Sequence, residues 1–236
     1  MKKSSKRHAE NISKVEASKI FKLSEAISFA QDAKRAKFVE SVDIHMKLGV
    51  DPKKADQAVR GTVSLPHGTG KKISVLVFAT GTEAEAARAA GADFVGMEDL
   101  IEKIQGGWTG FDIAIATPPS MREVGKLGKF LGPRGLMPTP KAGTVTADVA
   151  TAVAEFKAGK VEFRVDRQGG INNSIGKVNF SADKLLENLH AFISAILRAK
   201  PAACKGTYIK SMAISTTMGP GFRLDVNEAE RESVKK

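Results

Sequence analysis

The sequence predicts a two-domain protein of mixed α/β and α+β class. Apolar and polar residues alternate near both ends of the chain, whereas the middle has nearly continuous apolar stretches separated by helical ones. The formal charge is +11, but residues 67–159 contain ten Lys and Arg and ten Asp and Glu, so the whole excess lies outside them. We therefore predict a basic, discontinuous α+β domain with an antiparallel sheet from residues 1–66 plus 160–236, and an inserted neutral α/β domain at 67–159.

The first part of the chain predicts a helix followed by a strand. Ser24 has the character of an N-cap, with Glu25 in the first turn of a helix that continues to about Ala36. From Phe38 the period changes to two, which is typical of a half-buried strand in an antiparallel sheet. Its apolar face comprises Val42, Ile44, Met46 and Leu48. A short helix is expected to start at Asp51-Pro52.

The middle of the chain alternates between strands and helices. Strands are predicted at Ile73–Ala79, Asp93–Val95 and Phe111–Ala116. Helices are predicted up to Gly91, at Glu98–Gln105, from Pro119 to about Phe130, and around Ala147–Lys157. Such alternation predicts a parallel sheet covered by helices on both faces, a three-layer, Rossmann-like arrangement. The Gly- and Pro-rich stretch from Leu131 to Val145 is too dense in breakers for either regular structure.

The last part of the chain returns to α+β character. Val161–Asp166 and Ile171–Phe180 are predicted to form a hairpin around Gly169-Gly170. A helix from Ala182 to Ala199 and a strand from Thr207 to Ser215 follow. Two closely spaced connections then join the two domains, which is typical of a hinge.

Enzyme and metal signatures are missing from the sequence. The four histidines are scattered and Cys204 is the single cysteine, so no metal site is expected. Gly68–Lys72 departs from a Walker loop, because Leu65 and Lys72 occupy positions that need Gly and Ser or Thr. Gly81 alone makes no dinucleotide fingerprint. We predict no catalytic residue and no cofactor, with a metabolic enzyme built on the α/β block as the alternative.

The chain is also expected to be soluble and cytoplasmic. Its basic start has no apolar stretch behind it, which argues against a secretory signal, and no stretch approaches the length of a membrane span. A charge of +11 favours a polyanionic partner such as nucleic acid or an anionic membrane, and charge alone does not distinguish the two.

Two groups of residues suit contacts with RNA. The polar face of the first strand, preceded by Lys34, Arg35, Lys37 and Phe38, combines cations, a hydroxyl group and an aromatic ring, as phosphate and sugar contacts require. That face consists of Ser41, Asp43, His45 and Lys47. The alternative is a solvated strand face with Phe38 in the core.

The second group is Thr216–Gly221, where hydroxyl groups and glycines allow hydrogen bonding and close approach of the backbone to a ligand. The alternative is a plain strand end followed by a turn. Arg134 and Lys141 in the Gly- and Pro-rich loop either bind phosphate or lie on an exposed loop.

Three stretches resemble signature sequences of the bacterial large-subunit ribosomal protein L-one family. They are Val63–Gly70, Leu131–Val145 and Ser215–Gly219, and the match runs in order from about Val15 to Val226. The resemblance implies a discontinuous α+β domain, an inserted α/β domain and a hinge. It implies a structural constituent of the large ribosomal subunit, found in the cytoplasm on ribosomes, without a cofactor.

The resemblance also implies specific partners. The first is large-subunit ribosomal RNA, bound at a helical junction in the mobile stalk beside the tRNA exit site. The others are exit-site tRNA, whose deacylated form the protein helps to release, and the messenger of its own operon, whose translation it represses. A monomer outside the ribosome and no membrane contact are expected. A free-standing repressor that never joins the ribosome is the alternative.

Position by position, the resemblance assigns the RNA contacts to the basic domain. They are Glu25, Lys37, Phe38, Ser41, Asn172, Gly176, Lys177, Thr217, Met218 and Gly219. An acidic Glu25 would orient a neighbouring lysine or accept a hydrogen bond from a sugar hydroxyl. Many family members have His where this chain has Asn172, so one side-chain hydrogen bond differs. The Leu131–Val145 loop has no implied role beyond contact with tRNA or with the other domain.

Overall fold

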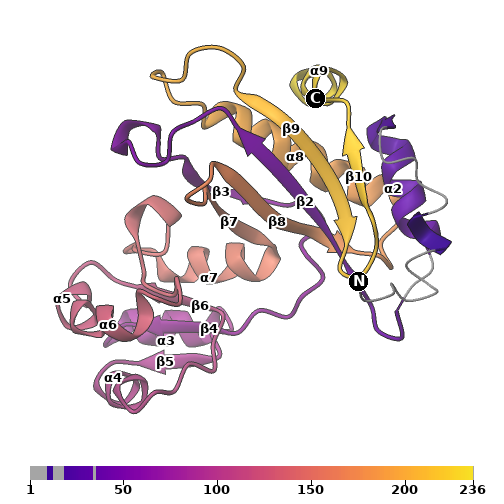
Figure 1. Ribbon diagram of the computed structural model, residues 1–236. Coiled ribbons are helices and arrows are strands. Elements are labelled where there is room, and N and C mark those ends of the chain that lie inside the picture. Colours follow the sequence, from indigo (N-terminus) through magenta and orange to yellow (C-terminus); the bar gives the residue numbers. More distant parts are fainter. Residues whose placement is uncertain (1–9, 13–18, 34–35, 236) are drawn as a thin grey trace, which may run out of the picture. The chain divides into compact units, whose positions relative to one another are not determined.

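The computed structural model describes residues 10–12, 19–33 and 36–235, and they form two compact units (Figure 1). Unit 1 consists of the described parts of Met1–Gly70 and Glu162–Lys236, and unit 2 is Lys71–Val161. The mixed α/β and α+β class is confirmed, because unit 1 contains a mainly antiparallel sheet and unit 2 a parallel one. No helix of the described residues is long and apolar enough to cross a membrane.

The main sheet of unit 1 has five strands and is assembled from both ends of the chain. In spatial order they are β1 (Ile20–Phe21), β10 (Gly221–Leu224), β9 (Ile209–Thr216), β2 (Ser41–Leu48) and β8 (Gly170–Lys177). β1 runs parallel to β10, and the other pairs are antiparallel. The early strand β2 therefore lies between two strands from the last third of the chain.

One face of this sheet is buried and the other is open. Val42, Ile44, Met46 and Leu48 are all buried, which confirms the period of two in β2. The helices that contact the sheet strands are α2 (Leu23–Asp32), α8 (Ala182–Arg198) and α9 (Val226–Lys235). Burial of the aliphatic side chains between this face and the helices is the main source of the layer's stability. The polar residues of β2 remain on the open face.

The first helix differs from its prediction at both ends. Ser24 is not the N-cap: α2 begins at Leu23 after Lys22, and the cap has no side-chain hydrogen bond. Phe21 and Leu23 are both buried, so packing against the sheet fixes the start of the helix in place of a cap. The helix ends at Asp32, because Ala33 has extended backbone, and not near Ala36.

The predicted hairpin between 161–166 and 171–180 is wrong. β7 (Lys160–Arg164) pairs with β3 (Arg60–Ser64) in a separate two-stranded sheet, whereas β8 pairs with β2. The Gly-rich turn exists, and the Asp166 carboxylate accepts hydrogen bonds from the N–H groups of Gln168 and Gly170. The chain turns there as expected, but the two strands pair with different strands.

The helix expected at Asp51-Pro52 is a turn followed by one 3-10 turn, η1 (Ala55–Gln57).

Unit 2 has the expected parallel sheet with helices on both faces. The strand order is β5 (Phe94–Gly96), β4 (Val75–Phe78) and β6 (Ile113–Ala116). One apolar core includes residues of α4 (Glu98–Gln105), and the other includes residues of α3 (Thr82–Ala89) and α7 (Val149–Ala158). β4 supplies Leu76 and Phe78 to the first core and Val75 and Val77 to the second, so its continuous apolar sequence reflects burial on both faces.

The single helix predicted from Pro119 to Phe130 is broken into three short turns. They are α5 (Met121–Val124), η2 (Gly125–Leu127) and α6 (Gly128–Leu131). Gly125 and Gly128 begin the second and third of these, which agrees with the low helix propensity of glycine. Between Leu131 and Val145 the only helical turn is η3 (Pro140–Ala142), as expected for a stretch dense in Gly and Pro.

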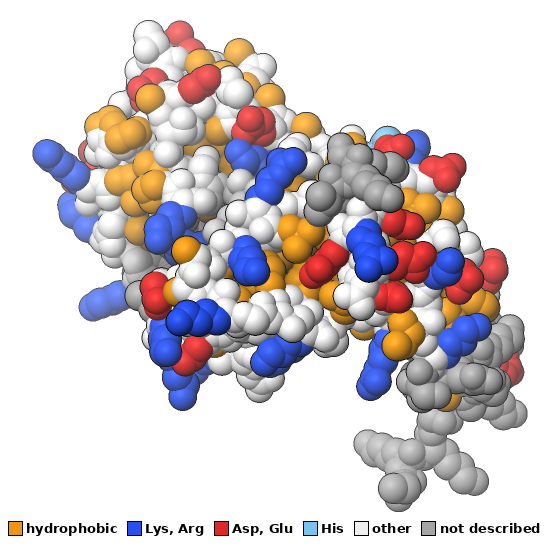
Figure 2. Space-filling model, turned by 90° about the horizontal axis from the view of Figure 1, so that it is seen from above, with side chains coloured by type: hydrophobic (Ala, Val, Ile, Leu, Met, Phe, Trp, Pro, Cys, Tyr) orange, Lys and Arg blue, Asp and Glu red, His pale blue; other side chains and the backbone are white. Residues whose placement is uncertain are grey.

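Net charge is unevenly divided between the two units. Unit 2 contains eleven Lys and Arg and ten Asp and Glu, so ten of the eleven net positive charges belong to the sequence of unit 1. On the face drawn in Figure 2, Lys and Arg side chains (blue) stand apart from one another with some Asp and Glu side chains (red) between them. That face shows no continuous patch of positive charge. Unit 1 is identified as the electropositive part by the count of charged residues in its sequence.

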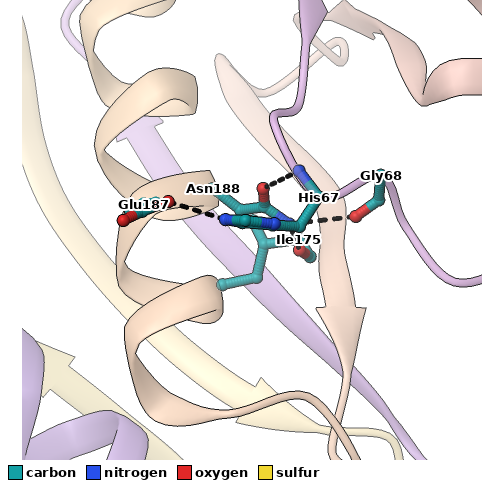
Figure 3. A network of polar contacts seen from close by, with 5 residues as sticks. All are labelled: His67, Gly68, Ile175, Glu187 and Asn188. Atoms are coloured by element: carbon teal, nitrogen blue, oxygen red, sulfur yellow. Dashed lines mark hydrogen bonds and ion pairs between the residues drawn. The ribbon is translucent and has the colours of Figure 1, made fainter.

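A buried asparagine holds the segment through which the chain leaves unit 1 (Figure 3). The Asn188 side chain of α8 is fully buried; its Oδ1 accepts from the N–H of His67 at 3.0 Å. Its Nδ2 donates to the carbonyl oxygens of Gly68 (2.9 Å) and Ile175 (2.8 Å). His67 also contacts the Glu187 carboxylate at 2.6 Å. One side chain thus ties the exit segment to a helix and to β8.

Candidate nucleic-acid interface

Eight of the ten assigned residues meet at one end of the main sheet of unit 1. We call this the Ser41 end and define it as residues 36–41, 176–178 and 216–219. Lys37 and Phe38 come from the segment before β2, and Ser41 is its first residue. Gly176 and Lys177 come from the end of β8, and Thr217, Met218 and Gly219 from the turn between β9 and β10. Ser41 lies opposite Lys177, and Val42 lies opposite Thr216. Antiparallel pairing therefore joins three segments that are far apart in the sequence.

Ser41 links the three segments through hydrogen bonds. Its N–H donates to the Thr217 hydroxyl oxygen at 3.0 Å, and its carbonyl oxygen accepts from the Thr217 N–H at 3.2 Å. The Lys177 ammonium donates to the Ser41 hydroxyl oxygen at 2.8 Å. The cation of Lys177 and the hydroxyl of Thr217 are therefore held on neighbouring positions, a mixture that suits phosphate and sugar contacts.

Glu40 fixes the same arrangement from inside, and sequence reasoning did not find it. It is only 3% exposed. One carboxylate oxygen accepts from the Ala36 N–H at 2.6 Å, and the other accepts from the Met218 N–H at 3.0 Å. Its own carbonyl oxygen accepts from the Val178 N–H at 3.1 Å. A carboxylate three positions after Lys37 in the sequence looks like an ordinary surface charge, so only the fold reveals that it connects all three segments.

Two assigned glycines are required by packing inside the protein. A Cβ on Gly219 would meet the Thr216 hydroxyl oxygen at 2.2 Å, and a Cβ on Gly176 would meet the Leu185 side chain at 2.8 Å. Both contacts are shorter than real Cβ atoms tolerate, so a larger residue would force the Thr216 or Leu185 side chain to move. These glycines therefore shape the surface whether or not they touch RNA.

Large apolar side chains are exposed at the Ser41 end. Phe38 is 53% exposed and Met218 is 50% exposed, so the alternative that Phe38 lies in the core is wrong. Val39 beside it is also exposed. Exposed apolar groups among cations and hydroxyls are typical of a binding surface, where an aromatic ring can stack on a base or a sugar.

Asn172 and Glu25 lie outside this cluster. Asn172 is on the open face of the sheet, four residues and about 13 Å along β8 from Gly176. Its Oδ1 contacts His45 Nδ1 at 2.8 Å, and His45 Nε2 contacts the Ser215 hydroxyl oxygen at 2.9 Å. Glu25 is exposed in the first turn of α2, seven residues and about 10 Å of helix axis from Asp32.

Among the described residues, Cys204 and Asp112 make structural contacts, and no cluster could hold a metal ion. Within residues 10–12, 19–33 and 36–235, no three His, Cys, Asp or Glu side chains are grouped to hold a metal ion. Cys204 is buried and its Sγ faces the Gly49 carbonyl oxygen. Asp112 has a structural role at the edge of the parallel sheet. Its carboxylate accepts hydrogen bonds from the Lys71 ammonium and the Ser74 N–H, and these two contacts, the lysine's first, hold its pKa below the ordinary value.

Comparisons with known proteins agree with the resemblance seen in the three signature stretches. The sequence profile of the Ribosomal protein L1p/L10e family matches residues 29–220. The large ribosomal subunit protein uL1 of Protochlamydia amoebophila (strain UWE25) is 56% identical, and the alignment covers 98% of both chains. The protein of that name from Paenarthrobacter aurescens (strain TC1) is also 56% identical, over 96% of this chain and 97% of its own.

A third relative, the large ribosomal subunit protein uL1 of Thermobifida fusca (strain YX), is 54% identical over 99% of each chain. These relatives are ribosomal proteins and not enzymes, which confirms the prediction of a non-enzymatic chain. The metabolic-enzyme alternative has no support from them.

Proposed function

This chain belongs to the Ribosomal protein L1p/L10e family, and from that premise we propose that it is a structural constituent of the large ribosomal subunit that binds large-subunit ribosomal RNA. The binding surface in this proposal is the Ser41 end of unit 1. One observation carries it: three segments that are distant in the sequence meet there, tied together by Ser41 and the buried Glu40. Units 1 and 2 then act as separate domains, with unit 1 supplying most of the RNA affinity.

The proposed mechanism is recognition by shape. Because Glu40 and Ser41 already hold the turn and the strand ends, little conformational entropy is lost when RNA binds. Lys37 and Lys177 supply charge to phosphates, and the turn at Thr217 to Gly219 places main chain and a hydroxyl against sugars. Asn172 adds an amide contact on the open face.

Finer roles rest on the family resemblance. We propose that the target is the helical junction of the mobile stalk beside the tRNA exit site, and that the protein assists release of deacylated tRNA there. The same surface would bind the messenger of its own operon and repress translation. Outside the ribosome the protein is proposed to be a monomer in the cytoplasm.

The direct test is binding of the full chain to a labelled fragment of the large-subunit stalk RNA over a salt series. We expect tight binding whose logarithm falls linearly with the logarithm of salt concentration, because Lys and Arg displace counterions from phosphates. An unrelated hairpin of equal length should compete poorly. Equal affinity for both RNAs would reduce the chain to a basic protein with generic attraction, and the proposed function would be wrong.

Replacing Glu40 by Gln tests whether the buried carboxylate positions the interface. Gln offers one oxygen acceptor where Glu offers two, so the N–H of either Ala36 or Met218 loses its partner. We expect the affinity for stalk RNA to fall by about 5- to 10-fold, equivalent to about 1 kcal/mol for one lost hydrogen bond.

The direction of the change is informative, because removing a negative charge near RNA should otherwise strengthen binding. Glu162→Gln is the matched control: Glu162 is exposed, also belongs to unit 1 and has the same charge. That control should bind equally well or slightly better than the original chain. A tighter complex with Glu40→Gln would show that the carboxylate acts only as a repulsive charge.

A further inference from the structure

The end of the main sheet opposite the Ser41 end carries an unassigned concentration of positive charge. We call it the Gly49 end and define it as residues 49–57, 164–170 and 199–210. These three segments, which are loops with the adjoining strand ends, contain seven Lys and Arg and three Asp, which leaves four net positive charges. All seven cationic side chains are exposed: Lys53, Lys54, Arg164, Arg167, Lys200, Lys205 and Lys210. The residues assigned by the family resemblance do not include any of them.

The three loops are held together at Gly49. The Gly49 N–H donates to the Tyr208 carbonyl oxygen at 2.7 Å, and the Leu48 N–H donates to the Gly169 carbonyl oxygen at 2.8 Å. A Cβ on Gly49 would meet the Thr207 carbonyl oxygen at 2.3 Å, so the chains approach as closely as glycine allows. The backbone segments that carry the cations are therefore joined to one another by hydrogen bonds.

Two of the three aspartates in these segments accept hydrogen bonds from backbone N–H groups. Asp166 turns its carboxylate to the N–H groups of Gly170 and Gln168, which hold its pKa below the ordinary value. Asp51 accepts from the N–H of Lys53 at 3.1 Å. Within the described part of the chain, none of the seven cations forms an ion pair with a carboxylate. Lys53, Arg164 and Arg167 line a hollow of about 320 Å³, to which Asp166 also contributes, so three cations face one carboxylate there.

The path between the two ends of the sheet is open and polar. β2 runs from Ser41 to Leu48, so the ends are separated by about 23 Å. A groove of about 920 Å³ covers the half of the open face nearer the Gly49 end. Its lining includes His45, Asn172, Lys210 and Arg223, and also the acidic residues Asp166 and Asp225. Asn172, already assigned to the RNA interface, lies between the two ends. An RNA that reached Asn172 from the Ser41 end would lie at the edge of this groove.

We propose that the Gly49 end is a second contact surface for the same ribosomal RNA and binds phosphates of its backbone. This inference rests on the proposed function. The Ser41 end contains Lys37 and Lys177 but also Glu40, so it contributes little net charge, whereas the Gly49 end supplies four net positive charges. The Ser41 end then provides shape recognition, and the Gly49 end provides most of the salt-dependent attraction in this sheet.

The test compares two triple variants of the full chain, each with three cations replaced by Gln. The first changes Lys53, Arg164 and Arg167 at the hollow. The matched control changes Lys184 on α8, Arg231 on α9 and Lys103 on α4, which are exposed and lie outside both ends of the sheet. Both variants lose the same charge, so any difference between them reports position and not net charge.

We expect the first variant to lose about two to three units of the slope of log affinity against log salt for stalk RNA. Between 50 and 200 mM salt, the original chain should then weaken by about 15- to 60-fold more than this variant does. The control variant should keep the original slope. Hydroxyl-radical footprinting should show two separated protected regions on the RNA, of which the first variant loses one.

Equal slopes for the two variants, with both protected regions intact, would overturn the second contact surface. That result is distinguishable from failure of the proposed function, in which the original chain itself would not prefer stalk RNA to an unrelated hairpin. An acidic protein as the true partner of the Gly49 end would also give equal slopes, and it would overturn the proposal in the same way.

Discussion

Replacing Met218 by Asp is expected to lower the affinity for large-subunit stalk RNA by about 100-fold, the largest effect on binding of any change considered. Met218 is half exposed at the tip of the Ser41 end, and its N–H is fixed by the buried Glu40. Aspartate at this position removes an apolar contact and sets a negative charge against the RNA backbone, where like-charge contacts cost several kcal/mol. Filter binding at constant salt measures the change.

Folding should be unaffected, because an exposed side chain outside the core changes stability by about 0.5 kcal/mol or less. Met218→Leu keeps an apolar side chain of similar size and should bind within a few-fold of the original chain. Gln105→Glu adds the same negative charge at an exposed position of α4 in unit 2 and should also bind nearly normally. Unchanged binding by Met218→Asp would remove the turn between β9 and β10 from the interface.

Replacing Asn188 by Leu is expected to cost about 3 to 5 kcal/mol of unfolding free energy, the largest loss of stability. Leucine fills a similar volume but leaves the His67 N–H and the carbonyl oxygens of Gly68 and Ile175 without their buried partner. Each buried polar group that loses its hydrogen bond costs about 1 to 3 kcal/mol. Urea unfolding followed by far-ultraviolet circular dichroism measures the loss.

The control is Asn173→Leu, because Asn173 makes one side-chain hydrogen bond, to the Glu162 carbonyl oxygen, near the surface. It should cost about 1 kcal/mol. Trp108 is the single tryptophan and lies in unit 2, so its fluorescence follows that unit. If the units unfold independently, Asn188→Leu shifts the dichroism transition and leaves the fluorescence transition in place. A loss below about 1 kcal/mol would mean that water or backbone movement replaces the Asn188 contacts.

The spacing of apolar residues was enough to predict the helices and strands that bury one or both of their faces. α4 has the predicted bounds, Glu98–Gln105, because its apolar residues recur at helical spacing and glycines follow it. The alternation in β2 and the apolar stretch of β4 also reflect the faces that these strands bury. In each case the information lies within one short window of sequence.

Pairing between distant segments was not predictable in the same way. The hairpin expected around Gly169-Gly170 joins two strands that pair elsewhere, because β2 lies beside β8 and β3 beside β7. The short strands β1 and β10 carry too few residues for a period, and α9 was also not predicted. Their formation depends on partners supplied by the rest of unit 1.

In the candidate site, too, some features could be predicted from the sequence and others depended on the fold. The resemblance supplied ten residues, and the fold gathers eight of them at the Ser41 end, but their contact with RNA stays a prediction. Glu40 could not be found from its sequence neighbours, because its importance comes from two N–H groups, one of them 178 positions away. A buried carboxylate of this kind is visible only after the chain has folded.

The placement of β2 between β8 and β9 also constrains how the protein is made. While the chain is being synthesised, β2 leaves the translating ribosome long before β8 and β9, the strands that flank it. During that time it has no strand to pair with on either side. Lys71–Val161 is continuous and can fold during that interval, whereas the sheet of unit 1 closes only when β9 has emerged. A chain truncated before Ile209 would therefore lack the turn that bears Met218, which makes attachment to RNA a property of completed molecules.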